Sequence, residues 1–175
     1  TKAIKALAKV GADLNIHNSE GQTPANIAVR YDHIDMIRVL AALGVDLNSS
    51  DKSGDTLTHV AARHGHVGMI RVLSELGIDL NALDKRGATL AHKAAQHRHV
   101  GVVKALAALG TSLDELDSQG WTTAHEAAKN GCVEVITTLH EARIQLNKKD
   151  HKIRTPVHLA ARHGHVNVMN TLIQA

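Results

Sequence analysis

The sequence predicts an all-α solenoid, in which short helix pairs stack side by side instead of surrounding one globular core. A fixed repeat of roughly 20 to 50 residues is typical of such architectures. Trp121 and Tyr31 are the only residues among Phe, Trp and Tyr, so Ala, Val, Leu and Ile must form a thin core. The period of 33 residues is carried by two glycine series, Gly21, Gly54, Gly87 and Gly120, and Gly11, Gly44, Gly77 and Gly110.

The period divides residues 1–175 into one array of repeated units. Residues 1–17 correspond to the second helix and exit loop of an earlier unit. Five further units are predicted at 18–50, 51–83, 84–116, 117–149 and 150–175, of which the last is incomplete. Both ends of the chain fall inside an apolar helical pattern, so we expect it to belong to a longer protein with other domains.

Each unit carries the signals of two helices. A threonine that can cap free backbone N–H groups opens the first helix, and Pro24 or Pro156 suits its first turn. The second helix has apolar residues at helical spacing, such as Val67, Ile70 and Leu73, and ends at a glycine. The predicted helix pairs span 24–43, 57–76, 90–109, 123–142 and 156–173.

The junction between the fourth and fifth units departs from the period. Arg143 replaces the glycine that ends the second helix, and Ile153 replaces the glycine of the hairpin. A residue other than glycine at positive φ costs about 1 kcal/mol or more. We therefore expect residues 143–154 to follow a different path and to be the least regular loop.

The residues that repeat resemble those of the ankyrin repeat family. T-P-V-H-L-A-A at 155–161 and T-L-T-H-V-A-A-R-H-G-H-V at 56–67 are similar to the family's first helix and turn. L-G-V-D-L-N at 43–48 is similar to the end of its repeat. The resemblance implies stacked helix-turn-helix units with projecting hairpin loops, and a role as a protein-binding module or scaffold. It does not identify the ligand.

Composition argues against several other classes of protein. The formal net charge is +3, from 20 Lys and Arg against 17 Asp and Glu, which is too small to indicate nucleic-acid binding. No apolar run approaches the roughly 20 residues that span a bilayer, so no membrane insertion is expected. The single cysteine, Cys132, cannot form an internal disulfide, which favours a cytoplasmic or other intracellular location.

The 14 histidines raise the question of a metal site. Three His-x-His pairs, such as His64 and His66, recur once per unit without a cysteine or an acidic third ligand, so a metal site is disfavoured. The family resemblance implies instead that the His of T-x-x-H makes an internal hydrogen bond and that the His after Gly lies in the turn between helices.

No catalytic motif stands out. Cys132 occupies the slot that His66 fills in another unit, so a substituted turn residue is favoured over an activated nucleophile. His125-Glu126 resembles the start of a zinc-protease motif, but the second histidine is absent, and the phosphate-binding and hydrolase motifs are missing. We predict that the chain is not an enzyme and needs no metal or cofactor.

The resemblance leaves one modification open. Asn48, Asn81 and Asn147 end L-N segments that resemble targets of a cytosolic asparaginyl hydroxylase. Asparagine also satisfies backbone groups of turns through its own side chain, and this simpler role is favoured.

Two slots that differ between units are predicted to select the partner. One follows the leading Asp on the hairpin, and the other follows the Ala-Ala pair of the first helix; most Asp and Glu fall elsewhere. The predicted partner-binding residues are Arg30, Tyr31, Lys52, Arg63, Lys85, Arg86, His97, Trp121, Lys129, Lys152, Arg154 and Arg162. A basic concave face would bind an acidic or phosphorylated protein segment.

Other interpretations of this face remain open. Single-stranded nucleic acid is disfavoured because only two aromatic side chains are available for stacking. Surface charge can also serve solubility alone. Finally, the array can be a substrate-targeting arm of a larger enzyme or effector whose catalytic domain lies outside this chain.

Trp121 is expected to be partly exposed and to anchor the partner, because it falls in a variable slot where other units carry Asp55, Ala88 and Arg154. Arg86, Lys129 and Arg154 are expected to hold the partner's acidic groups. In the alternative interpretation the ring lies flat on its own hairpin and covers aliphatic stems.

One ion pair between units is also predicted. Lys93 and Glu126 occupy equivalent slots of adjacent units. We therefore expect them to face one another across the stacking interface. An exposed pair of this kind contributes only about 0 to 1 kcal/mol.

Overall fold

The computed structural model describes residues 4, 6 and 9–175, within which ten helices follow one another in pairs. The first helices are α2 (Pro24–Arg30), α4 (Leu57–His64), α6 (Leu90–Gln96), α8 (Thr123–Lys129) and α10 (Pro156–Arg162). The second helices are α3 (Ile34–Ala42), α5 (Val67–Glu75), α7 (Val100–Ala108), α9 (Val133–Glu141) and α11 (Val166–Gln174). The prediction of an all-α array is confirmed, and the helix predicted near the N-terminus lies mostly outside the described residues.

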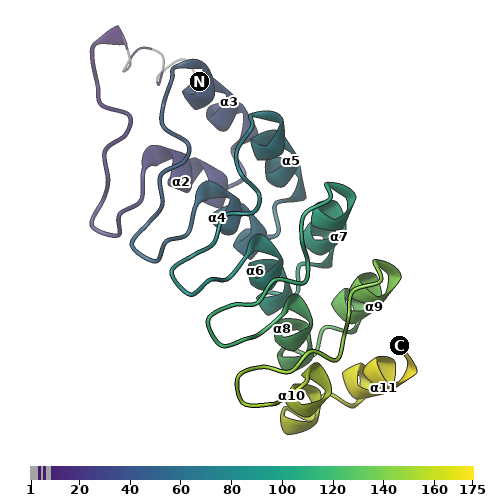
Figure 1. Cartoon of the computed structure of the whole chain (residues 1–175). Coiled ribbons are helices and arrows are strands. Elements are labelled where there is room, and N and C mark those ends of the chain that lie inside the picture. The colour runs from purple at the N-terminus through teal and green to yellow at the C-terminus, as the bar shows by residue number, and fades with distance from the viewer. Residues whose placement is uncertain (1–3, 5, 7–8) are drawn as a thin grey trace.

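The helices form two rows that run the length of the molecule (Figure 1). Each first helix packs against the first helices of the neighbouring units, as α4 does against α6 and α8 against α10. The second helices form the other row, and the loops project to one side of the helices. Within the described part of the chain, every helix is too short or too polar to cross a membrane.

Each first helix begins at a threonine that exchanges hydrogen bonds with the side chain three residues later. In the third unit, the hydroxyl of Thr89 accepts from the backbone N–H of His92, and the backbone N–H of Thr89 donates to Nδ1 of His92 at 3.2 Å. Asn26 takes the place of this histidine beside Thr23 in the first unit. These exchanges satisfy N–H groups that a helix start leaves free.

The core lies between the two rows and consists of small and branched apolar side chains. Ala61, Ala62, Ala94 and Ala95 are fully buried, which lets neighbouring first helices approach closely. Leucines and isoleucines of the second helices, such as Leu73, complete this core from the other row. The predicted core of Ala, Val, Leu and Ile is therefore present, although one aromatic ring also belongs to it, as described below.

The loop between the fourth and fifth units keeps the regular path, so the predicted detour is wrong. Arg143 and Ile153 adopt φ values of 58° and 60°, the left-handed conformation that glycine takes elsewhere. The backbone N–H of Ile153 donates to the carbonyl of Asp150 at 2.9 Å, as that of Gly87 donates to Asp84 at 2.9 Å. Retained turn hydrogen bonds thus offset a local strain of about 1 to 3 kcal/mol.

Candidate partner-binding groove

The histidines of the T-x-x-H segments tie each first helix to the hairpin of the next unit. Because Nδ1 accepts from the threonine N–H, Nε2 carries the proton and donates to a carbonyl 29 residues later. The bonds join His59 to Ala88 at 3.0 Å, His92 to Trp121 at 2.8 Å and His125 to Arg154 at 3.1 Å. Burial lowers the pKa of all three histidines, so they remain neutral. Their predicted role as internal hydrogen-bonding residues is confirmed.

The histidines of the turn between the two helices of a unit reach back to the preceding unit. Nε2 of His66, His99 and His165 bonds the carbonyls of Arg30, Arg63 and Lys129 at 2.9 to 3.0 Å. These carbonyls lie at or next to the ends of the first helices, so the bonds hold the backbone that carries the basic side chains there. Among the described residues, no group of three His, Cys, Asp or Glu side chains is placed to hold a metal ion.

Cys132 stands where other units have the turn histidine, and it is buried. A Cβ added at Gly65 would lie 2.7 Å from the ring of His99. The residue equivalent to Gly65 in the unit before Cys132 is Arg98, which carries a Cβ at φ 62°. Asp32, at φ 57°, is the equivalent residue before His66, which keeps its imidazole, so the missing glycine does not by itself account for the cysteine. Burial raises the pKa of the Cys132 thiol, which disfavours the thiolate that a nucleophile requires.

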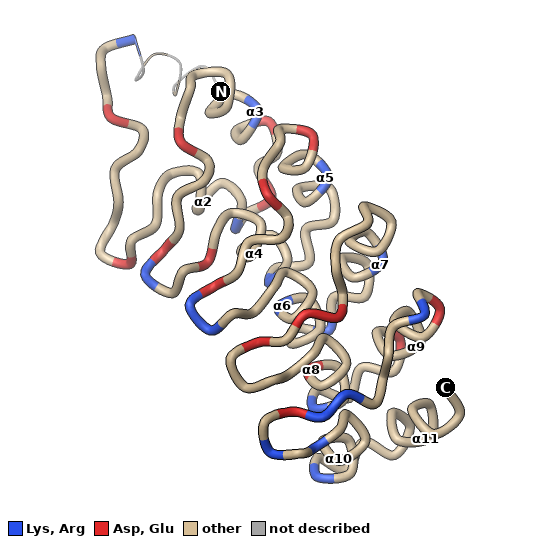
Figure 2. Tube along the Cα trace, viewed as in Figure 1, with Lys and Arg blue, Asp and Glu red and all other residues tan. Residues whose placement is uncertain are grey.

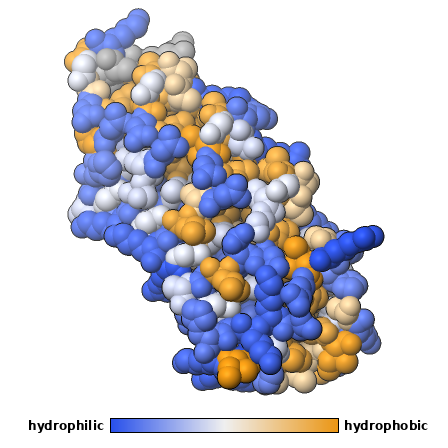
Figure 3. All heavy atoms as spheres, in the orientation of Figure 1, coloured by the Kyte–Doolittle hydropathy of each residue, from blue (hydrophilic) through white to orange (hydrophobic). Residues whose placement is uncertain are grey.

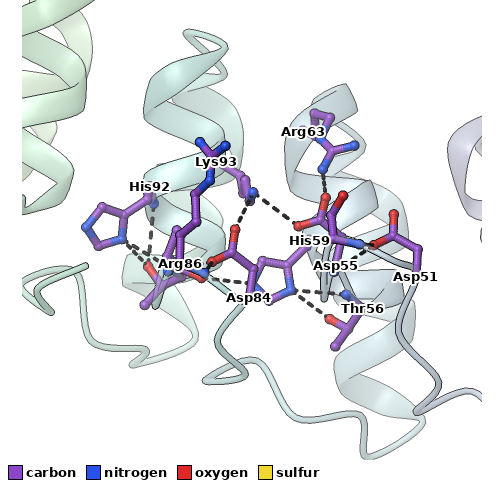
Figure 4. A network of polar contacts seen from close by, with 12 residues as sticks. Asp51, Asp55, Thr56, His59, Arg63, Asp84, Arg86, His92 and Lys93 are labelled. Atoms are coloured by element: carbon purple, nitrogen blue, oxygen red, sulfur yellow. Dashed lines mark hydrogen bonds and ion pairs between the residues drawn. The ribbon is translucent and has the colours of Figure 1, made fainter. Parts of the chain in front are cut away.

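A buried charge network joins the second and third units (Figure 4). Asp55 is fully buried and forms an ion pair with Arg63. Lys93 lies between two carboxylates, with Nζ 3.1 Å from Oδ1 of Asp55 and 2.6 Å from Oδ2 of Asp84. Burial by itself raises the pKa of Asp84, but hydrogen bonds from Lys93 and from the backbone of Ala88 and Arg86 bring it below its ordinary value.

The predicted pair of Lys93 with Glu126 is therefore wrong. Lys93 turns to Asp55 and Asp84, whose carboxylates are more deeply buried and offer stronger interactions. Glu126 instead accepts a hydrogen bond from Nδ2 of Asn130 at 3.2 Å. Burial raises the pKa of Glu126.

Two hollows beside α2, α4 and α6 form one groove, which we call the basic groove. The first, of about 550 Å³, is lined by Arg30, Lys52 and Arg63 among others, and the second, of about 500 Å³, by Lys85, Arg86 and His97 among others. Arg63 and Ser53 line both hollows and so connect them. The structure thus brings together six of the predicted partner-binding residues.

The electrostatic character of this groove is positive. Burial and the charge of Arg63 lower the pKa of His97, and burial, His66 and Arg30 lower that of His64. Among the ion pairs of the described residues, none involves Arg30, Lys52, Lys85 or Arg86. All four cations are exposed, although Nζ of Lys85 already donates one hydrogen bond to the backbone carbonyl of Lys52 at 2.7 Å.

The other predicted residues lie outside the groove. Tyr31, Lys152 and Arg162 are exposed but line neither hollow. Lys129 and Arg154 lie over the Trp121 ring, with Nζ 4.9 Å and Cζ 5.7 Å from its centroid. The latter two cations therefore interact with an aromatic face.

Trp121 is buried, with only 6 % of its surface exposed, so the expectation of a partly exposed ring is wrong. Nε1 donates to Oδ2 of Asp150 at 3.0 Å, in the next unit. Its backbone carbonyl accepts from His92 of the preceding unit, and its backbone N–H donates to Asp117 at 2.8 Å. Trp121 thus joins the third, fourth and fifth units. The alternative interpretation, in which the ring covers only its own hairpin, is therefore also incomplete.

Sequence reasoning missed the carboxylates at the start of each unit. Asp84, Asp117 and Asp150 are buried, and Oδ1 of each accepts backbone N–H groups two and four residues later. The signal was present in the sequence, because an aspartate repeated every 33 residues before a turn is typical of side-chain capping of that turn. The second carboxylate oxygen, Oδ2, remains available for other partners. That of Asp84 binds Lys93, and that of Asp150 binds Trp121 and Arg154.

Comparison with known families agrees with this architecture. A model described as ankyrin repeats (3 copies) matches residues 1–84. A second, described as ankyrin repeats (many copies), matches 91–131 and 124–173. No curated protein sequence matches the chain. Ankyrin repeats are in general non-catalytic modules for protein–protein interaction. The matches cover nearly the whole chain and coincide with the stacked helix pairs, so the chain belongs to the ankyrin repeat family.

Proposed function

We propose that the basic groove binds an acidic or phosphorylated segment of a partner protein. The observation that carries this proposal is the row of exposed cations without ion pairs, Arg30, Lys52, Lys85 and Arg86, along two connected hollows. Glu20 and Asp51 also line the first hollow, but its three cations outnumber them, and an excess of one sign of charge along a groove attracts an oppositely charged ligand and orients it.

The balance of charge in the second hollow suits a phosphorylated side chain. Two carboxylates, Asp55 and Asp84, are paired with cations at this hollow, and four cations surround it, so two positive charges are in excess. The cations are Arg63, Lys85, Arg86 and Lys93. A phosphate group carries about 1.5 to 2 negative charges at neutral pH, and guanidinium groups bind its oxygens in pairs.

The positions of the two aromatic residues favour a protein ligand over single-stranded nucleic acid. Binding of single strands relies on exposed aromatic rings on which bases stack. Trp121 is buried, and Tyr31, 63 % exposed, lines neither hollow.

The proposal is tested with three fluorescent peptides of one length, rich in Glu, in phosphoserine or in Gln, by fluorescence anisotropy. The Glu and phosphoserine peptides should bind, and the Gln peptide should not. Replacing two of the groove cations together, Lys85→Ala and Arg86→Ala, should weaken binding at least about tenfold at low salt.

Lys104→Ala on α7 is the matched control, because it removes an exposed charge outside the groove. Its binding should equal that of the unmodified chain. Equal binding of the acidic and neutral peptides, or no loss in the groove variant, would overturn the proposed function.

A further inference from the structure

A second surface lies on the loops that lead from α5 and α7 to the following units. Leu83 and Leu116 are equivalent residues, each directly before the aspartate that starts the third or fourth unit. They are 56 % and 49 % exposed. Ser50 and Lys149 fill the same position in other units, so the fold does not require an apolar side chain there. Over the loops, Figure 3 shows small apolar patches set among hydrophilic residues.

An apolar hollow of about 220 Å³ opens beside Leu83. Leu80 and Leu83 from the loop, and Leu90 and Leu106 from α6 and α7, line it. Leu90 and Leu106 are buried core residues, so the floor of the hollow is the core itself. An apolar cavity of about 150 Å³ accepts a molecule of the size of benzene, so this hollow can seat one aliphatic side chain.

The rim of this hollow is acidic. Glu115 is the one charged residue among those lining it, and it is exposed. Asp79, also exposed, accepts the backbone N–H of the lining residue Asn81 at 2.8 Å. Lys148, on the next loop, is paired with Asp114 at 2.5 Å. Figure 2 shows Asp and Glu along these loops.

We propose that this hollow is a second binding site, which takes a protein segment carrying an aliphatic side chain between Lys or Arg residues. The aliphatic side chain enters the hollow between Leu83 and Leu90, and the cations meet Asp79 and Glu115. Opposite charge selects this ligand against the acidic segments that suit the basic groove. The two sites share no lining residue, so this inference is independent of the proposed function.

The test uses three peptides of one length: a central Leu among Lys and Gly, the same peptide with Ala for Leu, and the same with Glu for Lys. Binding is followed by nuclear magnetic resonance of leucine methyl groups. The Lys-Leu peptide should shift the methyl signals of Leu83, Leu90 and Leu106. Both altered peptides should bind at least about tenfold more weakly.

Two variants locate the binding. Leu83→Ser introduces the residue that Ser50 provides naturally at this position, and Glu115→Gln removes one rim charge; each should weaken binding by about tenfold. Arg86→Ala, in the basic groove, is the control and should leave binding of the Lys-Leu peptide unchanged.

Three results would overturn this proposal. These are unchanged leucine methyl signals, equal binding of the three peptides, and a Leu83→Ser variant that binds as well as the unmodified chain. Sedimentation velocity adds a fourth: a dimer that Leu83→Ser dissociates would make a second copy of this chain the occupant instead.

Discussion

Asp55 and Trp121 occupy the same position in the second and fourth units, and both are buried although their side chains share no chemistry. Asp55 is fully buried and pairs with Lys93 of the following unit. Trp121 is 6 % exposed and donates to Asp150 of the following unit. In both places the side chain connects its own unit to the next.

The comparison shows why this position differs so much between units. Each side chain must match a partner one unit further along the chain, and that partner differs as well: Lys93 for Asp55, but Asp150 for Trp121. A repeat array is stabilised by such contacts between neighbours. Variation between units at this position therefore reflects interfaces inside the array and does not indicate exposure to solvent.

The largest effect is expected for Trp121→Ala. The substitution empties a buried site and removes the N–H donor to Asp150, so it should lower the free energy of unfolding by about 3 kcal/mol or more. Urea unfolding followed by circular dichroism measures this loss. Trp121→Phe keeps much of the packing and should lose only about 1 kcal/mol. An unchanged midpoint for Trp121→Ala would show that the ring does not join the units.

The charge network should be the next most sensitive region. Lys93→Met leaves Asp55 and Asp84 without their shared cation, and should lower the free energy of unfolding by about 3 kcal/mol. Adding Asp55→Asn to this variant should restore part of the loss, because one buried charge is then removed. Lys104→Met on the exposed side of α7 is the control and should change stability by about 0.5 kcal/mol at most. Equal effects of the two lysine substitutions would contradict this account.

Stability should fall as the solution becomes acidic, because burial lowers the pKa of His59, His92 and His125. Their contribution is complete above the unfolded value of 6.5 and is lost as the pH falls below it. Each histidine adds a slope of at most about 1.4 kcal/mol per pH unit in this range.

Urea unfolding at several pH values between about 5 and 7.5 measures this slope. Burial raises the pKa of Glu126, so this residue makes stability fall as the pH rises, opposite to the histidines. The contribution of a histidine is therefore isolated by comparing a variant with the unmodified chain. His92→Asn, which introduces the residue that Asn26 provides in the first unit, should reduce the slope. A slope that His92→Asn leaves unaltered would show that this histidine is not held neutral by the fold.

The smallest effect is expected at the fourth junction. Arg143→Gly and Ile153→Gly should each raise the free energy of unfolding by about 1 kcal/mol, because glycine adopts positive φ without strain. Gly77→Ala is the reverse control, since nothing lies within 4 Å of the added Cβ and only the backbone conformation is strained. It should lower the melting temperature, and a rise would contradict the argument.

The period of the sequence predicts the helices, and the resemblance to ankyrin repeats implies the roles of the repeated histidines, because both depend on contacts that recur in every unit. It does not predict the partners of Trp121 or Lys93, which depend on how far one side chain reaches into the next unit. The path at Arg143 and Ile153 was mispredicted because turn hydrogen bonds outweigh a local preference. The groove was found in part, since Arg30, Lys52 and Lys85 form no ion pair among the described residues and their exposure does not depend on a carboxylate in another unit.

A double-mutant cycle between Trp121→Phe and Asp150→Asn tests most directly whether this position joins neighbouring units. Asp150→Asn keeps the side-chain size nearly constant, and Trp121→Phe keeps an aromatic ring but removes the Nε1 donor of the hydrogen bond to Oδ2. Because the two groups interact directly across the boundary, the effects of the single changes on the free energy of unfolding should differ from additivity by about 1 kcal/mol or more. Additive effects, with no coupling between Trp121 and Asp150, would contradict the account.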